Sequence, residues 1–154
     1  MSSSAPSAIY NYRVADASLA TSGQPSEEDL RAVAADGFDV VINLALHDDP
    51  RYSLPDETGL VSSLGMTYVH IPVQFARPRE ADLIAFFDAM DAHGEKKRLI
   101  HCAANKRVTA FLGLYRVIRQ KWDREKAFAL MNEIWIPDPV WSAFIEDMLA
   151  KHPR

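Results

Sequence analysis

Three short apolar runs constrain the fold of this chain most strongly. They lie within residues 38–46, 67–73 and 96–102, and the first of them is too short and too uniform to form an amphipathic helix. Their β-branched and aliphatic side chains are typical of strands that are buried on both faces of a sheet. Segments with helical spacing separate the runs, so we predict an α/β fold: a mostly parallel central sheet, flanked by helices and joined by right-handed crossovers.

The segments around these runs supply the remaining elements. Residues 18–23 are a candidate short strand, and residues 10–13 are a candidate edge strand. Ser26, with Asp29 three residues later, is a helix-start signal, and Gly37 can end that helix. Helical spacing predicts further helices over residues 55–65, from Pro78 through Met90, and over 108–122, 123–135 and 138–152.

The length and composition fit one globular domain. The chain has 154 residues, of which 48% are hydrophobic and 25% are charged, and this is enough chain for a sizeable hydrophobic core. We predict that residues 9–154 form a single domain and that residues 1–8, a Ser-rich segment, form a mobile tail.

Charge and hydropathy argue against several classes of partner. The net charge of −4 and the isoelectric point near 5.7 do not suit a surface that binds nucleic acid or an anionic membrane. No run reaches the roughly 18 apolar residues of a membrane span, and the first ten residues lack the basic start and apolar core of a signal peptide. We therefore expect a cytoplasmic protein that binds neither nucleic acid nor membrane.

The histidines and the single cysteine predict no metal site. The five histidines are scattered without the spacing of metal ligands, and one cysteine cannot form an internal disulfide. We expect neither a metal nor a cofactor.

The only cysteine, Cys102, stands where a predicted strand meets a predicted helix. Ligands of α/β sheets bind beyond the carboxyl ends of the strands, where a loop leads into the next helix. Unpaired N–H groups and the dipole at a helix start favour an anion or a reactive thiolate there. Arg107 could add a planar two-point clamp for a phosphate or a similar oxyanion. The ordinary alternatives are a small core residue for Cys102 and solvated charges for Lys106 and Arg107.

The segment LIHCAANKRVTAFLGLYR, residues 99–116, resembles the phosphate-binding loop and following helix of the cysteine-based protein tyrosine phosphatase superfamily. The resemblance is closest to a bacterial group of small, dual-specificity-like phosphatases. It extends over residues 22–46, which are similar to that group's opening strand, helix and strand. It also covers residues 68–87, which are similar to the region before the catalytic strand.

The resemblance implies a two-step covalent mechanism without a metal. Cys102 is the implied nucleophile, and Arg107 is implied to hold the equatorial oxygens of the phosphoryl group. Thr109 takes the position of the hydroxyl that helps the cysteine leave, and His101 supports the thiolate from behind. The implied partner is a phosphorylated small molecule or a phosphoprotein. Its phosphate would be cradled by the backbone of Ala103, Ala104, Asn105, Lys106 and Arg107.

The loop itself departs from the superfamily pattern. That pattern has five residues between cysteine and arginine, whereas CAANKR has four, and Val108 stands where the arginine normally falls. Losing one residue at a helix start rotates a side chain by roughly 100° and shifts it by about 1.5 Å. Such loops usually contain a glycine where the backbone needs positive φ, and here Asn105 is the one residue that tolerates this conformation well.

The sequence also departs from the phosphatase pattern at the position of the general acid. The place where the group carries an aspartate holds Gln74 and Phe75. Asp82 is a candidate replacement, as is Asp48 in the loop after another strand. The ordinary interpretation of an acid such as Asp82 is that it stabilises the first turn of a helix. Without an acid, aryl phosphates should still react, while alkyl phosphates should be poor substrates, so an aryl or tyrosine phosphate is favoured.

Two alternatives fit these departures. Sulfurtransferases of the rhodanese type carry a cysteine loop with four residues before the arginine, and this spacing suits persulfide chemistry at Cys102. A non-catalytic module that binds an anionic or phosphorylated ligand explains both departures without any chemistry. Arg77 and Arg79 could draw an anionic ligand to the rim, although solvated charges at a helix start are the ordinary interpretation.

Overall fold

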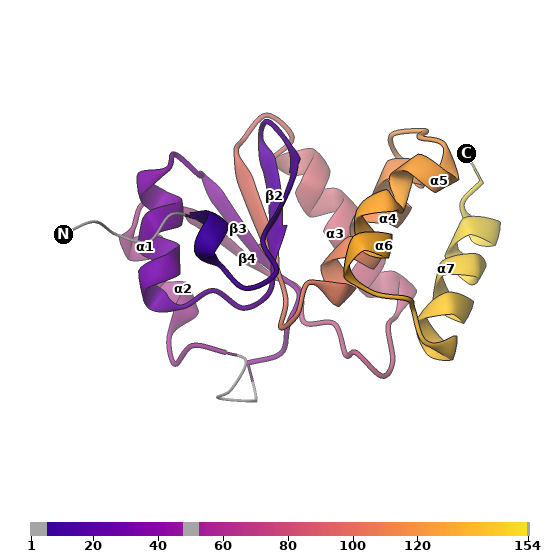
Figure 1. The fold of residues 1–154 in the computed structure, drawn as a ribbon, viewed down its shortest axis with the longest axis horizontal. Helices are drawn as coiled ribbons and strands as arrows, with labels where there is room; N and C mark the ends of the chain where they lie inside the picture. The colour runs from indigo at the N-terminus through magenta and orange to yellow at the C-terminus, as the bar shows by residue number, and fades with distance from the viewer. Residues whose placement is uncertain (1–5, 48–52, 154) are drawn as a thin grey trace.

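A five-stranded sheet forms the centre of the computed structural model, which describes residues 6–47 and 53–153 (Figure 1). The strand order is β1-β2-β5-β3-β4, and only β1 runs antiparallel to its neighbour. The predicted α/β fold with a mostly parallel sheet is therefore confirmed. The strands are β1 Arg13–Asp16, β2 Leu19–Ser22, β3 Val40–Asn43, β4 Thr67–His70 and β5 Arg98–His101.

Helices cover both faces of the sheet, with α1 and α2 on one side in Figure 1 and the later helices on the other. Alternate side chains of a strand point to opposite faces, and β3 shows this directly. Val41 packs in one apolar cluster with residues of α1 and α2, while Val40 and Ile42 pack in a second cluster with residues of α3, α4 and α7. The helices are α1 Glu27–Ala35, α2 Glu57–Ser63, α3 Glu80–Ala92, α4 Lys106–Ile118, α5 Arg124–Ala127, α6 Ala129–Ile134 and α7 Pro139–Lys151.

The predicted signals around α1 are confirmed. The Ser26 side chain accepts from the Asp29 backbone N–H and the Asp29 carboxylate accepts from the Ser26 N–H, a complete capping box. Gly37 adopts a φ of 87° directly after the helix, a conformation that favours glycine. α3 begins two residues later than predicted, at Glu80, because Arg79 still has extended backbone angles.

One predicted helix, over residues 123–135, is divided into α5 and α6. The division falls at Phe128, whose ring packs against Gly113 in the buried helix α4. A Cβ atom on Gly113 would lie 2.3 Å from the Phe128 ring, so only glycine allows this approach. A tertiary contact therefore overrides the local helical pattern.

The N-terminal segment is partly described. Pro6–Ala8, within the segment predicted to be a tail, form a short 3₁₀ helix, η1. Ile9 follows it and is buried. Across the described residues, no helix has the length and apolar character that a membrane span requires.

The sheet aligns the last residues of four strands in one row. Ser22 of β2 and Asn43 of β3 both pair with His101 of β5, and Asn43 also pairs with His70 of β4. These are the carboxyl ends of parallel strands, the edge at which α/β sheets bind ligands. The row places four polar side chains next to the loop that follows β5.

Candidate active site

The Cys102 loop connects β5 to α4, as the sequence predicts. β5 ends at His101 and α4 begins at Lys106, so residues 102–105 form a short loop between a buried strand and a buried helix. Cys102 is 1% exposed. It is a free thiol at the N-terminal end of a 13-residue helix, where the helix dipole and unpaired N–H groups favour negative charge.

The backbone of this loop is tied to the N-terminal part of the chain. The Gln24 N–H donates to the Ala103 carbonyl at 3.0 Å, and the Asn11 side chain donates to the Ala104 carbonyl at 3.2 Å. The Cys102 N–H lies 3.4 Å from the Ser22 carbonyl. Because a trans peptide points its C=O and N–H in opposite directions, the Ala104 N–H faces away from Gln24. The loop is therefore anchored on its carbonyl side.

Asn105 supplies the conformation that a glycine usually provides. Its φ is 67°, in the left-handed region, and its side chain is buried. The Asn105 Nδ2 donates to the Asn11 carbonyl and to the Thr21 hydroxyl, both at 2.9 Å. A glycine would allow the same backbone angle but would make neither hydrogen bond, so asparagine both shapes and fastens the loop.

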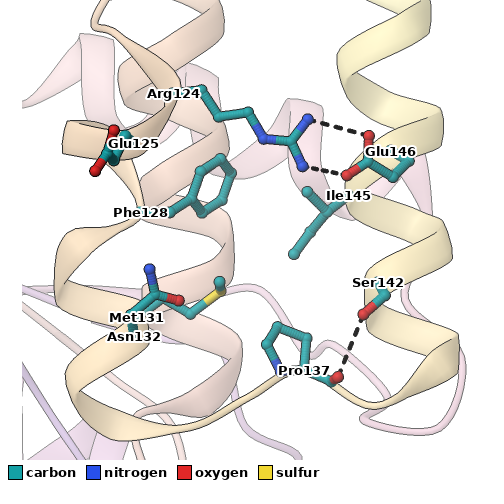
Figure 2. Close-up of a pocket in the computed structure, with 9 residues that line it drawn as sticks. All are labelled: Arg124, Glu125, Phe128, Met131, Asn132, Pro137, Ser142, Ile145 and Glu146. Carbon is teal, nitrogen blue, oxygen red and sulfur yellow. Dashed lines mark hydrogen bonds and ion pairs between the residues drawn. The ribbon is translucent and has the colours of Figure 1, made fainter.

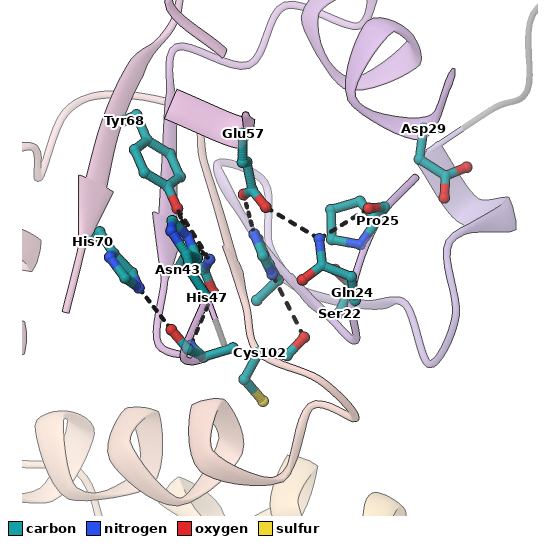
Figure 3. Close-up of polar contacts among 12 residues, drawn as sticks. Ser22, Gln24, Pro25, Asp29, Asn43, His47, Glu57, Tyr68, His70 and Cys102 are labelled. Carbon is teal, nitrogen blue, oxygen red and sulfur yellow. Dashed lines mark hydrogen bonds and ion pairs between the residues drawn. The ribbon is translucent and has the colours of Figure 1, made fainter. Parts of the chain in front are cut away.

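A buried ion pair stands behind the cysteine. The Nε2 atom of His101 lies 2.5 Å from Glu57 Oε2, and both side chains are fully buried. Gln24 also donates to Glu57, at 3.1 Å (Figure 3). Burial raises the pKa of Glu57, but the charge of His101 and its hydrogen bond, with a further hydrogen bond from Gln24, lower it below its ordinary value. Glu57 therefore holds the ring of His101 in place.

Sequence reasoning missed Glu57. The residue opens α2, where Asp56 caps the helix by accepting from the Gly59 N–H. An acid in a first helical turn is ordinary, and 44 residues separate Glu57 from His101 along the chain. Only the packing of α2 against the end of the sheet brings the two together.

A second polar cluster lies beside this pair, at the ends of β3 and β4 (Figure 3). The Tyr68 hydroxyl is 2.7 Å from His47 Nε2 and accepts from Asn43 Nδ2 at 3.0 Å. The His47 and His70 rings stack with their centroids 3.9 Å apart, and His70 Nε2 donates to the Ala45 carbonyl at 2.6 Å. Burial lowers the pKa of His70 and raises that of Tyr68, so both groups are neutral at pH 7.

Arg107 points from α4 toward the connection between β4 and α3. Its Nη1 donates to the Val73 carbonyl at 2.7 Å, and its guanidinium lies 5.9 Å from the centre of the Phe75 ring. Phe75 is itself held, since the Trp141 indole N–H donates to its carbonyl at 2.7 Å.

Lys106 lies over the rings of Phe75 and Trp135, 6.0 and 5.7 Å from their centres. The shortened loop thus places both cations beside the 71–79 connection.

Thr109 lies in the first turn of α4. Its hydroxyl is 2.8 Å from the Asn105 carbonyl and 3.1 Å from the Lys106 carbonyl, to which it donates. These contacts stabilise the helix start. A role for Thr109 in releasing the cysteine stays a prediction.

Of the two candidate general acids, Asp82 and Asp48, the structure describes only Asp82. Asp82 lies in the first turn of α3, is buried, and forms an ion pair with Arg79 at 3.1 Å. This is the ordinary stabilising contact that the sequence also allowed. Asp48 lies outside the described residues. The 71–79 connection contains Gln74 and Phe75 and no aspartate, so the identity of the proton donor stays a prediction.

A cavity of about 280 Å³ between α5–α6 and α7 lies apart from this site (Figure 2). Phe128, Met131 and Ile145 line it, and an ion pair between Arg124 and Glu146 spans it. It contains no residue of the 101–109 segment. It is a gap between packed helices, and the chemistry-bearing residues lie at the sheet edge instead.

Comparison with known proteins identifies the family. The model of the phosphatase-like domain of beta-lactamase hydrolase-like protein matches residues 11–120. The beta-lactamase hydrolase-like protein of Xylella fastidiosa (strain Temecula1) is 32% identical over 114 residues, which are 73% of this chain and 26% of that protein. This chain thus spans about a quarter of the length of the curated relatives it matches.

Solved structures agree with this assignment. A phosphatase-like protein (DUF442) from Shewanella putrefaciens CN-32 is 35% identical with a TM-score of 0.85, covering 96% of this chain and 97% of the other. Tk-PTP in its active form has a TM-score of 0.77 at 21% identity, covering 92% and 97%, and supports the fold. The chain therefore belongs to the family of the phosphatase-like domain of beta-lactamase hydrolase-like protein, and it shares its fold with Tk-PTP.

Proposed function

We propose that this domain is a cysteine-dependent phosphatase that hydrolyses a phosphomonoester, with aryl or tyrosine phosphates favoured. The observation that carries the proposal is the Cys102 loop: a buried thiol at the start of α4, on a backbone that Asn105 turns through positive φ. Family membership supports the phosphatase class. TpbA of Pseudomonas aeruginosa, which shares the fold at 18% identity, has been crystallised in complex with phosphotyrosine.

The proposed reaction has two steps. The Cys102 thiolate attacks phosphorus and forms a sulfur–phosphorus bond, while the aryl oxide leaves with the electrons of the broken ester bond. Water then attacks the phosphocysteine, releases inorganic phosphate and regenerates the thiolate. Loop amides and Arg107 stabilise the charge on the phosphoryl oxygens in both steps. An aryl oxide leaves without full protonation, which suits a 71–79 connection that has no aspartate.

Replacing Cys102 by serine should abolish turnover of para-nitrophenyl phosphate. A serine hydroxyl is not ionised at neutral pH and lacks the nucleophilicity of a thiolate, so the covalent step stops. The measurement is steady-state release of para-nitrophenol by the purified wild type and variant, with phosphate binding to the variant measured by calorimetry. Turnover that survives in Cys102→Ser would contradict the proposal. Phosphate binding without turnover by the wild type would assign a binding module instead.

The spacing of four residues between Cys102 and Arg107 supports a second candidate, sulfur transfer. In that reaction the thiolate attacks the outer sulfur of thiosulfate, a persulfide forms on Cys102, and sulfite leaves. Incubation with thiosulfate should then add one sulfur atom to the intact protein by mass spectrometry. An unchanged mass, with Cys102→Ser as the blank, would exclude this activity.

A further inference from the structure

A second cavity adjoins the candidate active site, with a volume of about 350 Å³. It lies beyond the carboxyl ends of β3 and β4 and takes in part of the 71–79 connection. The link to the Cys102 loop is Val73, whose carbonyl accepts the hydrogen bond from Arg107 at 2.7 Å. The residues that line the cavity are Leu46, Pro72, Gln74, Arg77, Arg79 and Asp82.

Pro72 and Gln74 stand on either side of Val73 in the chain, and both line this cavity. Val73 itself contacts Arg107 through its carbonyl. Successive Cα atoms are only about 3.8 Å apart. Two lining residues of the cavity are therefore the immediate chain neighbours of the residue that contacts Arg107. The volume is many times the roughly 30 Å³ of one liquid water molecule, so the cavity has room for a hydrated oxyanion.

The charges of the described residues that line the cavity do not cancel. Arg79 is paired with Asp82 through two contacts, Nη2 to Oδ1 at 3.1 Å and Nε to Oδ2 at 3.3 Å. This pair is neutral and fixes the plane of the Arg79 guanidinium, whose remaining N–H groups are unused. Arg77 has no ion-pair or hydrogen-bond partner for its side chain among the described residues. Among the described residues that line the cavity, one uncompensated positive charge therefore remains, in a protein of net charge −4.

The donors in the cavity suit an oxyanion. Guanidinium groups bind carboxylates and phosphates through paired N–H donors, and the Gln74 amide adds a neutral donor. We propose that this cavity, the Arg77 pocket, binds a second anionic group of the substrate, a carboxylate or a phosphate, beside the phosphate held at Cys102. This proposal rests on the proposed phosphatase function, which places the first phosphate at Cys102. The substrate would then be a phosphomonoester with a second acidic group close to the scissile bond.

Substrates that differ only in the second anion test this proposal. We compare phenyl phosphate with 3-carboxyphenyl phosphate and with 1,3-phenylene bisphosphate, so that the carboxylate and the phosphate are separate arms. Wild type should prefer one or both doubly anionic substrates in kcat/KM. Arg77→Ala should lower kcat/KM for the preferred substrate about tenfold, mainly through KM, because one charged hydrogen-bonding group is lost. Turnover of phenyl phosphate should stay within about twofold.

Arg31→Ala is the matched control, since Arg31 is an exposed arginine on α1 and its removal changes the net charge equally. Equal effects of both variants, or equal effects on all three substrates, would overturn the proposal, because long-range charge alone would explain them.

Direct binding separates this proposal from the phosphatase function. If wild type turns over none of the substrates, calorimetric titration of the same three compounds into Cys102→Ser still tests the Arg77 pocket. Tighter binding of a doubly anionic compound, lost on adding Arg77→Ala, supports the pocket even without turnover. Equal affinity for phenyl phosphate and both doubly anionic compounds overturns it.

Discussion

Replacing Glu57 by alanine should lower the free energy of unfolding by about 3–5 kcal/mol, the range seen when one partner of a buried ion pair is removed. The Glu57 carboxylate and the His101 ring are fully buried and 2.5 Å apart. Without the carboxylate, His101 Nε2 loses its partner, and the side-chain amide of Gln24 loses one of its two acceptors and keeps the Pro25 carbonyl. Urea unfolding of wild type and variant, followed by circular dichroism, measures the difference.

Two control variants make this test specific. Glu57→Gln keeps the size of the side chain and an acceptor for His101 but removes the charge, so we expect a smaller loss of about 1–3 kcal/mol. Glu27→Ala removes an exposed acid from the first turn of α1, where a helix-start acid contributes only about 0.3–1 kcal/mol. A Glu57→Ala variant no less stable than Glu27→Ala would contradict the assigned role of the ion pair.

The effect of Glu57 should also depend on pH with a definite sign. The folded-state pKa of this carboxyl lies below its ordinary value of 4.5. A carboxyl of this kind adds stability above its ordinary pKa, and the contribution is lost as the pH falls through the folded-state pKa. The stability difference between wild type and Glu57→Ala should therefore be full at pH 7 and shrink below pH 4.5. A difference that grows on acidification would contradict this assignment.

The parts of the site that could be predicted from sequence are those with local signals. The apolar run before Cys102 and the helical spacing after it are both continuous in the chain, so they place the thiol at a strand-to-helix junction. The need for positive φ in a loop without glycine likewise pointed to Asn105, and its φ is 67°. Each of these predictions depends on neighbouring residues only.

The parts that sequence reasoning missed depend on contacts between distant segments. Glu57 has the sequence context of any first-turn acid, and only tertiary packing sets it against His101. The direction of Arg107 depends on the exact shape of a four-residue loop, which the spacing alone left open. The hydrogen bond from the Asn11 side chain to the Ala104 carbonyl of the loop joins two residues that are 93 positions apart in the chain. Periodicity and motif spacing carry no information on such pairings.

Replacing Asn105 by alanine should destabilise the protein by about 3–4 kcal/mol. The left-handed backbone costs a residue with a Cβ about 1–2 kcal/mol, and the variant also loses hydrogen bonds to the Asn11 carbonyl and the Thr21 hydroxyl, each of about 1 kcal/mol. The loop should then relax away from φ 67°. Since the loop amides form the proposed phosphate cradle, phosphate should no longer protect Cys102 from alkylation by iodoacetamide, as read by intact mass.

Asn105→Gly separates the two causes, because glycine adopts positive φ without strain but makes no side-chain hydrogen bond. We expect this variant to be about 1–2 kcal/mol more stable than Asn105→Ala and to retain part of the phosphate protection. If glycine restores both stability and protection fully, backbone conformation alone shapes the loop, and the Asn11 and Thr21 contacts contribute nothing measurable. If alanine behaves as wild type in both measurements, the loop does not require the left-handed residue, and the proposed cradle is wrong.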